Sequence, residues 1–253
     1  MTSMDQEKGR TAGVSRFLKE EVVSRNADLL LFTCCLTSGL VDSTIYNAYA
    51  TFVSMQTGNT IFLALGTSNQ NTRPYGWARS LTSIGCFVLG AFFFARLNQW
   101  IGAHRRGCLM LSFFIQASLI LITAALVQAG VVSSAMESGL VQTATQWDSE
   151  VPIVLLSFQS AGQIVASRAL GYNEIPTVVI TSLLCDLMSD PKLFILRNEK
   201  RDRRLAAFIF TLIGAIVGGW VTKATQQISP VLWLAAGIKF SVVLSWGFWK
   251  SKS

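Results

Sequence analysis

The sequence predicts an all-α membrane protein: a polytopic transmembrane helix bundle with about six spans and two short re-entrant or broken helices. The first observation is composition, because 51% of the 253 residues are hydrophobic and only 14% are charged, whereas soluble domains carry about 25% charged residues. The second is that the apolar residues gather in runs long enough to cross a bilayer. The third is that 15 of the 21 Lys and Arg residues fall in four segments outside these runs. This composition argues against a disordered chain, a disulfide-rich secreted scaffold and an ordinary cytosolic enzyme.

Six apolar segments approach the length of about 20 residues that a transmembrane helix needs. The clearest of them contains no charged residue over 24 positions. Two further apolar segments are short or interrupted by polar residues, so we expect them to break or to re-enter the membrane rather than cross it. The predicted spans are 29–46, 80–101, 107–130, 151–171, 205–222 and 231–249, and the two short segments are 49–65 and 175–188.

The distribution of basic residues decides between six and eight spans. Lys and Arg favour the cytoplasmic side of a membrane. With six spans, the N-terminal tail, the loop at Arg105 and Arg106, the segment 189–204 and the C-terminus share one side, whereas eight spans would divide them. We therefore predict six spans with both termini cytoplasmic. The net charge of +7 is then an orientation signal, and no nucleic-acid partner is expected; the partner implied is the lipid bilayer.

The chain divides into two halves with the same order of parts. A basic tail, 1–28, precedes the first membrane repeat, 29–130, and a polar outer linker, 131–150, leads to the second repeat, 151–253. Each repeat consists of a span, a short broken segment and two further spans. Because each half has three spans, the second enters the membrane from the opposite face, which predicts a 3+3 inverted repeat. Secondary transporters commonly have this design, with broken helices at the binding site.

Two polar stretches lie at corresponding places in the halves. Gly39-Leu-Val-Asp42 is followed by Met55-Gln-Thr57-Gly58-Asn59-Thr60, and in the second half Gln159-Ser-Ala-Gly162-Gln163 is followed by Thr181-Ser-Leu-Leu-Cys-Asp186. These stretches resemble the two signatures of the YoaK-like multi-pass membrane protein family (domain of unknown function 1275). The resemblance covers nearly the whole chain after residue 28. It implies a multi-pass membrane protein whose family has no settled biochemical activity.

In the first repeat, the candidate substrate- or ion-binding residues are Asp42, Thr57, Gly58 and Asn59. Asp42 lies within a predicted span, where an ionisable group costs about 2.5–3.5 kcal/mol, so it could hold a cation or carry a proton. The alternative is a position near the membrane interface. Gly58 interrupts the helix, and irregular backbone at this depth needs polar partners from protein or from a wet cavity. The break is therefore either a binding site or a buried, capped turn.

In the second repeat, the candidates are Gln163, Thr181 and Lys239. Hydroxyl and amide side chains at these positions could bind a ligand or join neighbouring helices. Lys239 lies near the middle of the last predicted span, within several ångströms of the depth of Asp42 at about 1.5 Å per residue. An ion pair with Asp42 and a snorkelling side chain are both compatible with this depth.

The remaining motifs concern assembly and catalysis. The stripe of Gly214 and Gly218 predicts close helix packing, either within the chain or in a homo-oligomer. The sequence lacks the H-E-x-x-H, G-x-S-x-G and P-loop motifs, so we expect no enzyme, no cofactor and no metal site. Two functions stay open. One is a small secondary transporter or carrier of a small molecule or ion, and the other is a non-transporting membrane scaffold or interaction protein that binds partners through the basic segment 189–204 and the N-terminal tail.

Overall fold

The computed structural model describes residues 13, 15–70, 75–132 and 147–252. Within these ranges the chain is helical apart from turns and two isolated β-bridges, which confirms the predicted fold class. The expectations for residues 1–12 and for most of the linker 131–150 lie outside the described residues. The helices are α2 (Asp28–Tyr49), α3 (Gln56–Thr67), α4 (Gly76–Ile101), α5 (Arg106–Gln128), α6 (Glu150–Ala169), α7 (Ile180–Met188), α8 (Glu199–Thr225) and α9 (Ser229–Phe248), with a 3₁₀ turn at Trp147–Ser149.

Five of the described helices, α2, α4, α5, α8 and α9, are long and apolar enough to cross a membrane. The sixth predicted span forms α6, whose 20 residues give a length of about 30 Å. This helix is less apolar because it carries buried polar side chains at Ser157, Gln159, Ser160, Gln163 and Ser167. It can keep them because they face protein rather than lipid.

The two short segments form short helices. Helix α3 has 12 residues and α7 has nine, which correspond to about 18 and 14 Å at 1.5 Å per residue. The hydrocarbon core of a bilayer is about 30 Å thick, so neither helix crosses it alone. The prediction of long spans combined with two short broken helices is confirmed.

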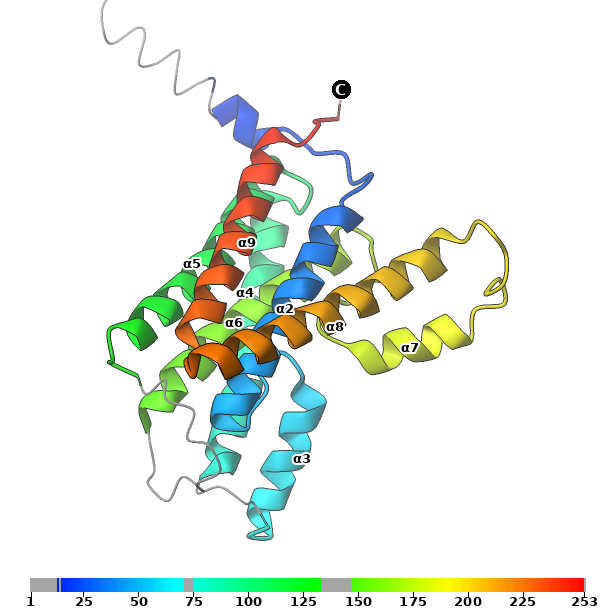
Figure 1. Cartoon of the computed structure of the whole chain (residues 1–253). Coiled ribbons are helices and arrows are strands. Elements are labelled where there is room, and N and C mark those ends of the chain that lie inside the picture. Colours follow the sequence, from blue (N-terminus) through cyan, green and yellow to red (C-terminus); the bar gives the residue numbers. More distant parts are fainter. Residues whose placement is uncertain (1–12, 14, 71–74, 133–146, 253) are drawn as a thin grey trace, which may run out of the picture.

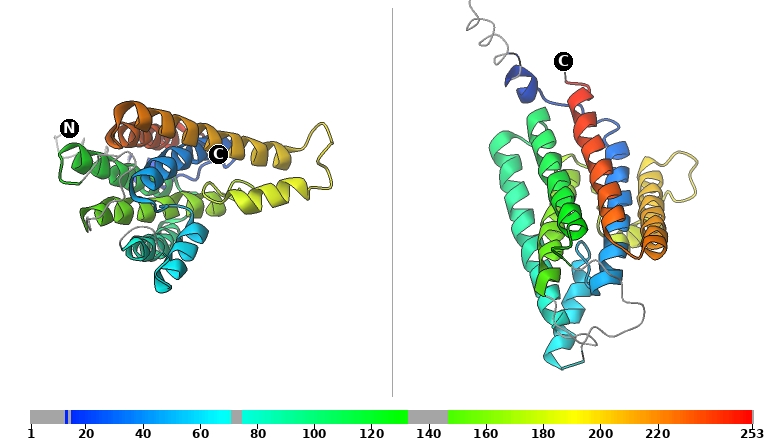
Figure 2. Two further views of the ribbon diagram at one scale, coloured as in Figure 1. Left: turned by 60° about the horizontal axis from the view of Figure 1, so that its bottom comes forward. Right: turned by 60° about the vertical axis from the view of Figure 1, so that its left-hand side comes forward.

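The long helices form one bundle, crossed by α8 (Figure 1). Helix α2 packs against α8 and α9, α4 packs against α6, and α5 lies against both α6 and α9. Helix α7 and the first turns of α8 project sideways from the bundle (Figure 2). The centre of the bundle is thus built from α2, α5, α6 and α9.

Glycines allow the backbones of α2 and α8 to approach closely. A Cβ atom added at Gly214 would lie 2.1 Å from the Leu36 carbonyl oxygen, and one at Gly39 would lie 2.1 Å from the Thr211 carbonyl oxygen. At Gly218, it would lie 2.8 Å from the Leu40 carbonyl oxygen. The stripe of Gly214 and Gly218 therefore packs within the chain, which was one of its two predicted uses. Homo-oligomerisation stays a prediction.

The basic segments meet at one end of the bundle. The N-terminal strand-like segment donates from the Val22 N–H to the His104 oxygen at 2.9 Å and from the Val23 N–H to the Lys250 oxygen at 3.0 Å. These bonds join the tail, the α4–α5 loop and the C-terminus, which lie together in Figure 1. The start of α8 joins the same end, because Arg203 Nε lies 2.9 Å from Asp28 Oδ2 at the start of α2. The four segments thus share one end, as the six-span prediction requires.

Candidate functional site

Lys239, on α9, is fully buried inside the bundle. Its Nζ donates to Gln116 Oε1 at 2.8 Å and to Gln163 Oε1 at 2.7 Å, and it lies 3.8 Å from Cys34 Sγ. Because these residues belong to α5, α6 and α2, four helices converge on one amine. We call Lys239, Gln116, Gln163 and Cys34 the lysine centre.

Hydroxyl groups surround the lysine centre. Gln116 Nε2 donates to Ser112 Oγ at 3.3 Å, and Gln163 Nε2 donates to Ser38 Oγ. The Phe113 ring lies 5.4 Å from Lys239 Nζ, within the range of a cation–π interaction. Within the described part of the chain, Lys239 has no ion pair with a carboxylate. The neighbours of its amine are therefore neutral groups.

The carboxylate of Asp42 caps a turn and does not reach the lysine centre. Its Oδ1 accepts from the Val53 N–H at 3.0 Å and the Ser54 N–H at 3.1 Å, and Oδ2 accepts from Ser54 Oγ. Asp42 lies eight residues beyond Cys34 on α2, about 12 Å along the helix axis. Of the sequence-based alternatives for Lys239, an ion pair with Asp42 is thus not formed in this structure.

Asn59 holds the same turn from the other side. Its Nδ2 donates to the Phe52 oxygen at 2.7 Å and to Ser83 Oγ at 2.9 Å, while its Oδ1 accepts from the Phe52 N–H at 3.1 Å. Ser83 Oγ also donates to the Phe52 oxygen at 2.8 Å, and Ser160 Oγ donates to the Val53 oxygen at 2.9 Å. Protein groups thus satisfy the backbone where the first broken helix is interrupted, as the capped-turn alternative expects.

The other predicted site residues lie apart from these two polar clusters. Thr57 is exposed in the first turn of α3, and Thr181 is exposed in the first turn of α7. Gly58 lies against the Phe52 ring, whose Cδ2 would be 2.9 Å from an added Cβ. The structure therefore brings Gln163 and Lys239 into one centre and Asp42 and Asn59 into a separate turn.

Thr177 marks the interruption before α7. It has a φ of +59°, which is strained for a β-branched residue, and the Val178 N–H donates to the Pro176 oxygen at 2.7 Å across it. Its buried hydroxyl has no hydrogen-bond partner among the described residues. Strain of this kind persists where the surrounding structure enforces it, often at functional positions.

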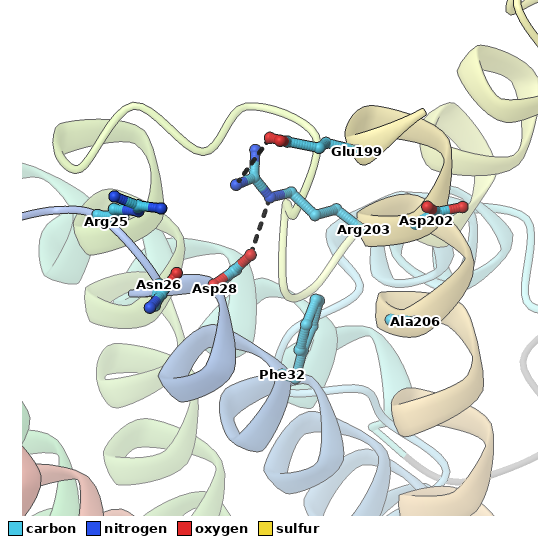
Figure 3. A pocket seen from close by; sticks show the side chains of 8 residues that line it. All are labelled: Arg25, Asn26, Asp28, Phe32, Glu199, Asp202, Arg203 and Ala206. Carbon is cyan, nitrogen blue, oxygen red and sulfur yellow. Dashed lines mark hydrogen bonds and ion pairs between the residues drawn. The ribbon is translucent and has the colours of Figure 1, made fainter. Parts of the chain in front are cut away.

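A cleft of about 470 Å³ opens between the starts of α2 and α8 (Figure 3). Arg203 crosses it, with Nε 2.9 Å from Asp28 Oδ2, Nη1 3.0 Å from Glu174 Oε1 and Nη2 3.6 Å from Glu199 Oε2. The charged side chains that line this cleft are two arginines and three acids: Arg25, Arg203, Asp28, Glu199 and Asp202. The ion pairs join α2, α8 and the α6–α7 connection at the basic end.

The sequence-based reasoning missed Gln116, Ser83 and Ser38. Gln116 carries the only side-chain amide in the otherwise strongly apolar run 107–127, and this contrast was the available signal. Ser83 and Ser38 gave no signal, because a serine in a span can bond to the carbonyl of its own helix. Their roles depend on which neighbouring helix they face.

Long apolar helices, two short broken helices and a buried polar centre together define a multi-pass membrane protein. The chain belongs to the family described as "Protein of unknown function (DUF1275)", whose model matches residues 30–245. This match confirms the resemblance found in the two polar stretches. No curated protein and no solved structure matches the chain.

Proposed function

We propose that this protein is a small secondary carrier in which the lysine centre is the substrate site and two inverted repeats are the moving parts. The observation that carries the proposal is the location of the lysine centre where helices of both halves meet. Carriers built from inverted repeats place their substrate sites at that interface. Asp42 and Asn59 then hold the first broken helix in place.

The helix contacts support the repeat. If α2, α3, α4 and α5 correspond to α6, α7, α8 and α9, each contact should have an equivalent. Helix α2 packs on α8, and its counterpart α6 packs on α4; α5 packs on α6, and α9 packs on α2. Likewise α3 packs on α4 and α7 on α8, while α5 and α9 pack on each other. A two-fold axis that interchanges the halves produces this pattern, because it turns each helix contact into its equivalent in the other half.

Residue positions support the same relation. Gly39 and Gly162 are 123 residues apart, as are Gln116 and Lys239. Both glycines lie where a Cβ would clash with the neighbouring helix, at Thr211 for Gly39 and at Gln116 for Gly162. Gln116 and Lys239 are equivalent positions that also contact each other at 2.8 Å. Equivalent residues that touch lie on the axis relating the halves, so the lysine centre is on this axis.

The orientation of the protein in the membrane follows from the distribution of its Lys and Arg residues. The four basic segments share the end of the bundle at which the chain enters α2 and leaves α9. Because Lys and Arg favour the cytoplasmic side, we assign this end, with both termini, to the cytoplasm.

Flux into proteoliposomes tests the carrier proposal. Purified protein is reconstituted and uptake is measured for a panel of labelled organic acids, amines, sugars and inorganic ions. We expect uptake of at least one class above that of empty vesicles, and its loss in Lys239→Met. Ser241→Ala is the matched control, because Ser241 is exposed on the same helix and its hydroxyl donates to the Ile238 carbonyl. Equal uptake by wild type and Lys239→Met would contradict the proposed site, and absence of any uptake would contradict the carrier.

A second candidate function, a membrane scaffold, is favoured by the segment 189–198 between α7 and α8. Phe194 and Leu196 are 95% and 94% exposed, and Arg201 fixes the segment by donating to the Leu193 and Ile195 oxygens at 2.8 and 2.7 Å. At its start, the Lys192 N–H, then Asn198 and Arg204, hold the pKa of Asp190 below its usual value. An ordered loop with exposed apolar side chains could bind a partner.

One comparison separates the two candidates. In cells with a phenotype that depends on this protein, the carrier proposal expects Lys239→Met to lose function, whereas the double change Phe194→Ser and Leu196→Ser retains it. The scaffold candidate expects the opposite pattern. Surface expression measured by cell-surface labelling controls for the amount of each variant.

A further inference from the structure

We propose that the lysine centre binds the carboxylate of a small organic acid that also carries a hydroxyl group. This proposal rests on the proposed carrier function for its biological role, but ligand binding can be measured without transport. It follows from the charge of the centre, from the hydrogen bonds around it and from one buried amide nearby.

The amine at the centre has no carboxylate partner among the described residues. Three acceptors lie around Lys239 Nζ, at 2.7 Å from Gln163, 2.8 Å from Gln116 and 3.8 Å from Cys34, which matches the three N–H bonds of an ammonium group. A buried charge is costly without an opposite charge. In a low-dielectric interior, the attraction between this ammonium and an anion is much stronger than in water.

The surrounding acidic groups do not supply that anion. Asp42, the buried carboxylate on α2, uses both oxygens on Val53 and Ser54. Asp28 and Glu174 are paired with Arg203 at the basic end. Of the acidic side chains in the described ranges, none therefore neutralises Lys239. A bound carboxylate would do so.

The two glutamines can accommodate a carboxylate. In the structure each amide directs its oxygen to Lys239 and its nitrogen to a hydroxyl, Ser112 for Gln116 and Ser38 for Gln163. Each amide nitrogen carries a second hydrogen. When a carboxylate replaces the amide oxygens at Lys239, one carboxylate oxygen accepts from the ammonium and the other can accept from an amide.

The unpaired oxygen of a buried amide is the reason to expect a hydroxyl group on the ligand. Gln159 lies one helical turn before Gln163 on the same face of α6. It is only 3% exposed, and its Oε1 has no hydrogen-bond partner among the described residues. A buried unpaired acceptor is costly. A ligand hydroxyl that reaches Gln159 Oε1 would donate to it.

Binding to the purified full chain in nanodiscs tests this assignment. The probes are lactate, 2-hydroxybutyrate and gluconate, each compared with a neutral analogue: 1,2-propanediol, 1,2-butanediol and sorbitol. Ligands that bind the folded protein raise its unfolding temperature, and titration calorimetry gives Kd. We expect at least one hydroxy acid to bind while its neutral analogue does not. Lys239→Met should weaken that binding about 10- to 100-fold, since hydrogen bonds to charged groups are among the strongest.

A second variant keeps the inference testable if Lys239→Met does not fold. Gln159→Leu leaves the charge in place and should remove the preference for the hydroxy acid over the same acid without its hydroxyl, such as lactate over propionate. Equal binding of acids and neutral analogues, or unchanged acid binding in Lys239→Met, would overturn the proposal. Binding of an acid without any flux would contradict the carrier function and support the binding site. Flux of a sugar or cation that does not depend on Lys239 would support a carrier function and contradict the binding site.

Discussion

Asp42 and Lys239 are both buried ionisable side chains, and they differ in the groups that hydrogen-bond to them. Asp42 accepts hydrogen bonds from two backbone N–H groups and one hydroxyl, so its charge is used within the protein. Lys239 has two neutral amide oxygens and a sulfur as neighbours. The first arrangement is that of a structural cap, whereas in the second no described carboxylate pairs with the amine.

At the residue scale, we predict different effects of two changes at Asp42. Asp42→Ala leaves the buried Val53 and Ser54 N–H groups without an acceptor and should lower the free energy of unfolding by about 2–4 kcal/mol. Asp42→Asn keeps one acceptor oxygen and should cost less than half as much. Unfolding in mixed detergent micelles measures both, with Glu199→Ala, whose side chain is 86% exposed, as the control. A stable Asp42→Ala variant would rule out the structural cap.

At the element scale, the bundle depends on close contacts between specific helix pairs. Gly214 on α8 meets the backbone of α2, and Gly90 on α4 meets the backbone of α6, where a Cβ would lie 2.5 Å from the Phe158 oxygen. In each case the third helix of one half meets the first helix of the other half. On the same two helices, an added Cβ at Gly219 or Gly85 meets no atom within 4 Å.

This contrast predicts the outcome of four glycine-to-alanine changes. Gly214→Ala and Gly90→Ala force two backbones apart and should each destabilise the protein by about 1–3 kcal/mol, the cost of overpacking. Gly219→Ala and Gly85→Ala should be neutral or stabilising by up to about 1 kcal/mol, because Ala favours helix over Gly. Thermal unfolding of the four variants compares them directly. Similar effects at contact and open positions would show that helix approach is not limited at these glycines.

At the scale of the whole molecule, Arg203 closes the basic end by joining α8 to Asp28 on α2 and to Glu174 before α7. Cys34 of the lysine centre lies six residues beyond Asp28, about 9 Å further along α2. A carrier must open this end to reach the centre from one side. The ion pairs around Arg203 are therefore the contacts that we expect to break when the protein opens inward.

Thiol labelling tests this gate. In a variant whose only cysteine is Cys34, which is fully buried, Arg203→Ala should increase the rate of alkylation by a membrane-impermeant maleimide several-fold from the basic end and not from the other. Arg201→Ala is the control, since Arg201 bonds to the loop carbonyls and to Asp202 but not to α2. Unchanged labelling in Arg203→Ala would mean that access to Cys34 is limited elsewhere.

The amino-acid sequence is sufficient to predict a membrane environment, a helical fold class, two short broken helices and the grouping of the basic segments at one end. These properties depend on segment length, apolarity and charge, which can be counted along the chain. Asp42, Asn59, Gln163 and Lys239 also stand out as candidates, because polar groups within apolar spans must avoid lipid. An interfacial Asp42 and a snorkelling Lys239 stayed open, and the structure instead buries both.

Which of these residues contact one another depends on how the helices pack in three dimensions. A rise of about 1.5 Å per residue gives only the depth of a residue in the membrane. Asp42 and Lys239 have similar predicted depths, so an ion pair between them was compatible with the sequence. The partners also depend on how each helix is rotated and how closely it approaches its neighbours, and Gly39, Gly162 and Gly214 set those approaches. As a result Lys239 contacts Gln116 and Gln163, while Asp42 caps the turn at Val53. Lys239 thus lies where the two halves meet, and among the described residues its amine contacts amides and no carboxylate.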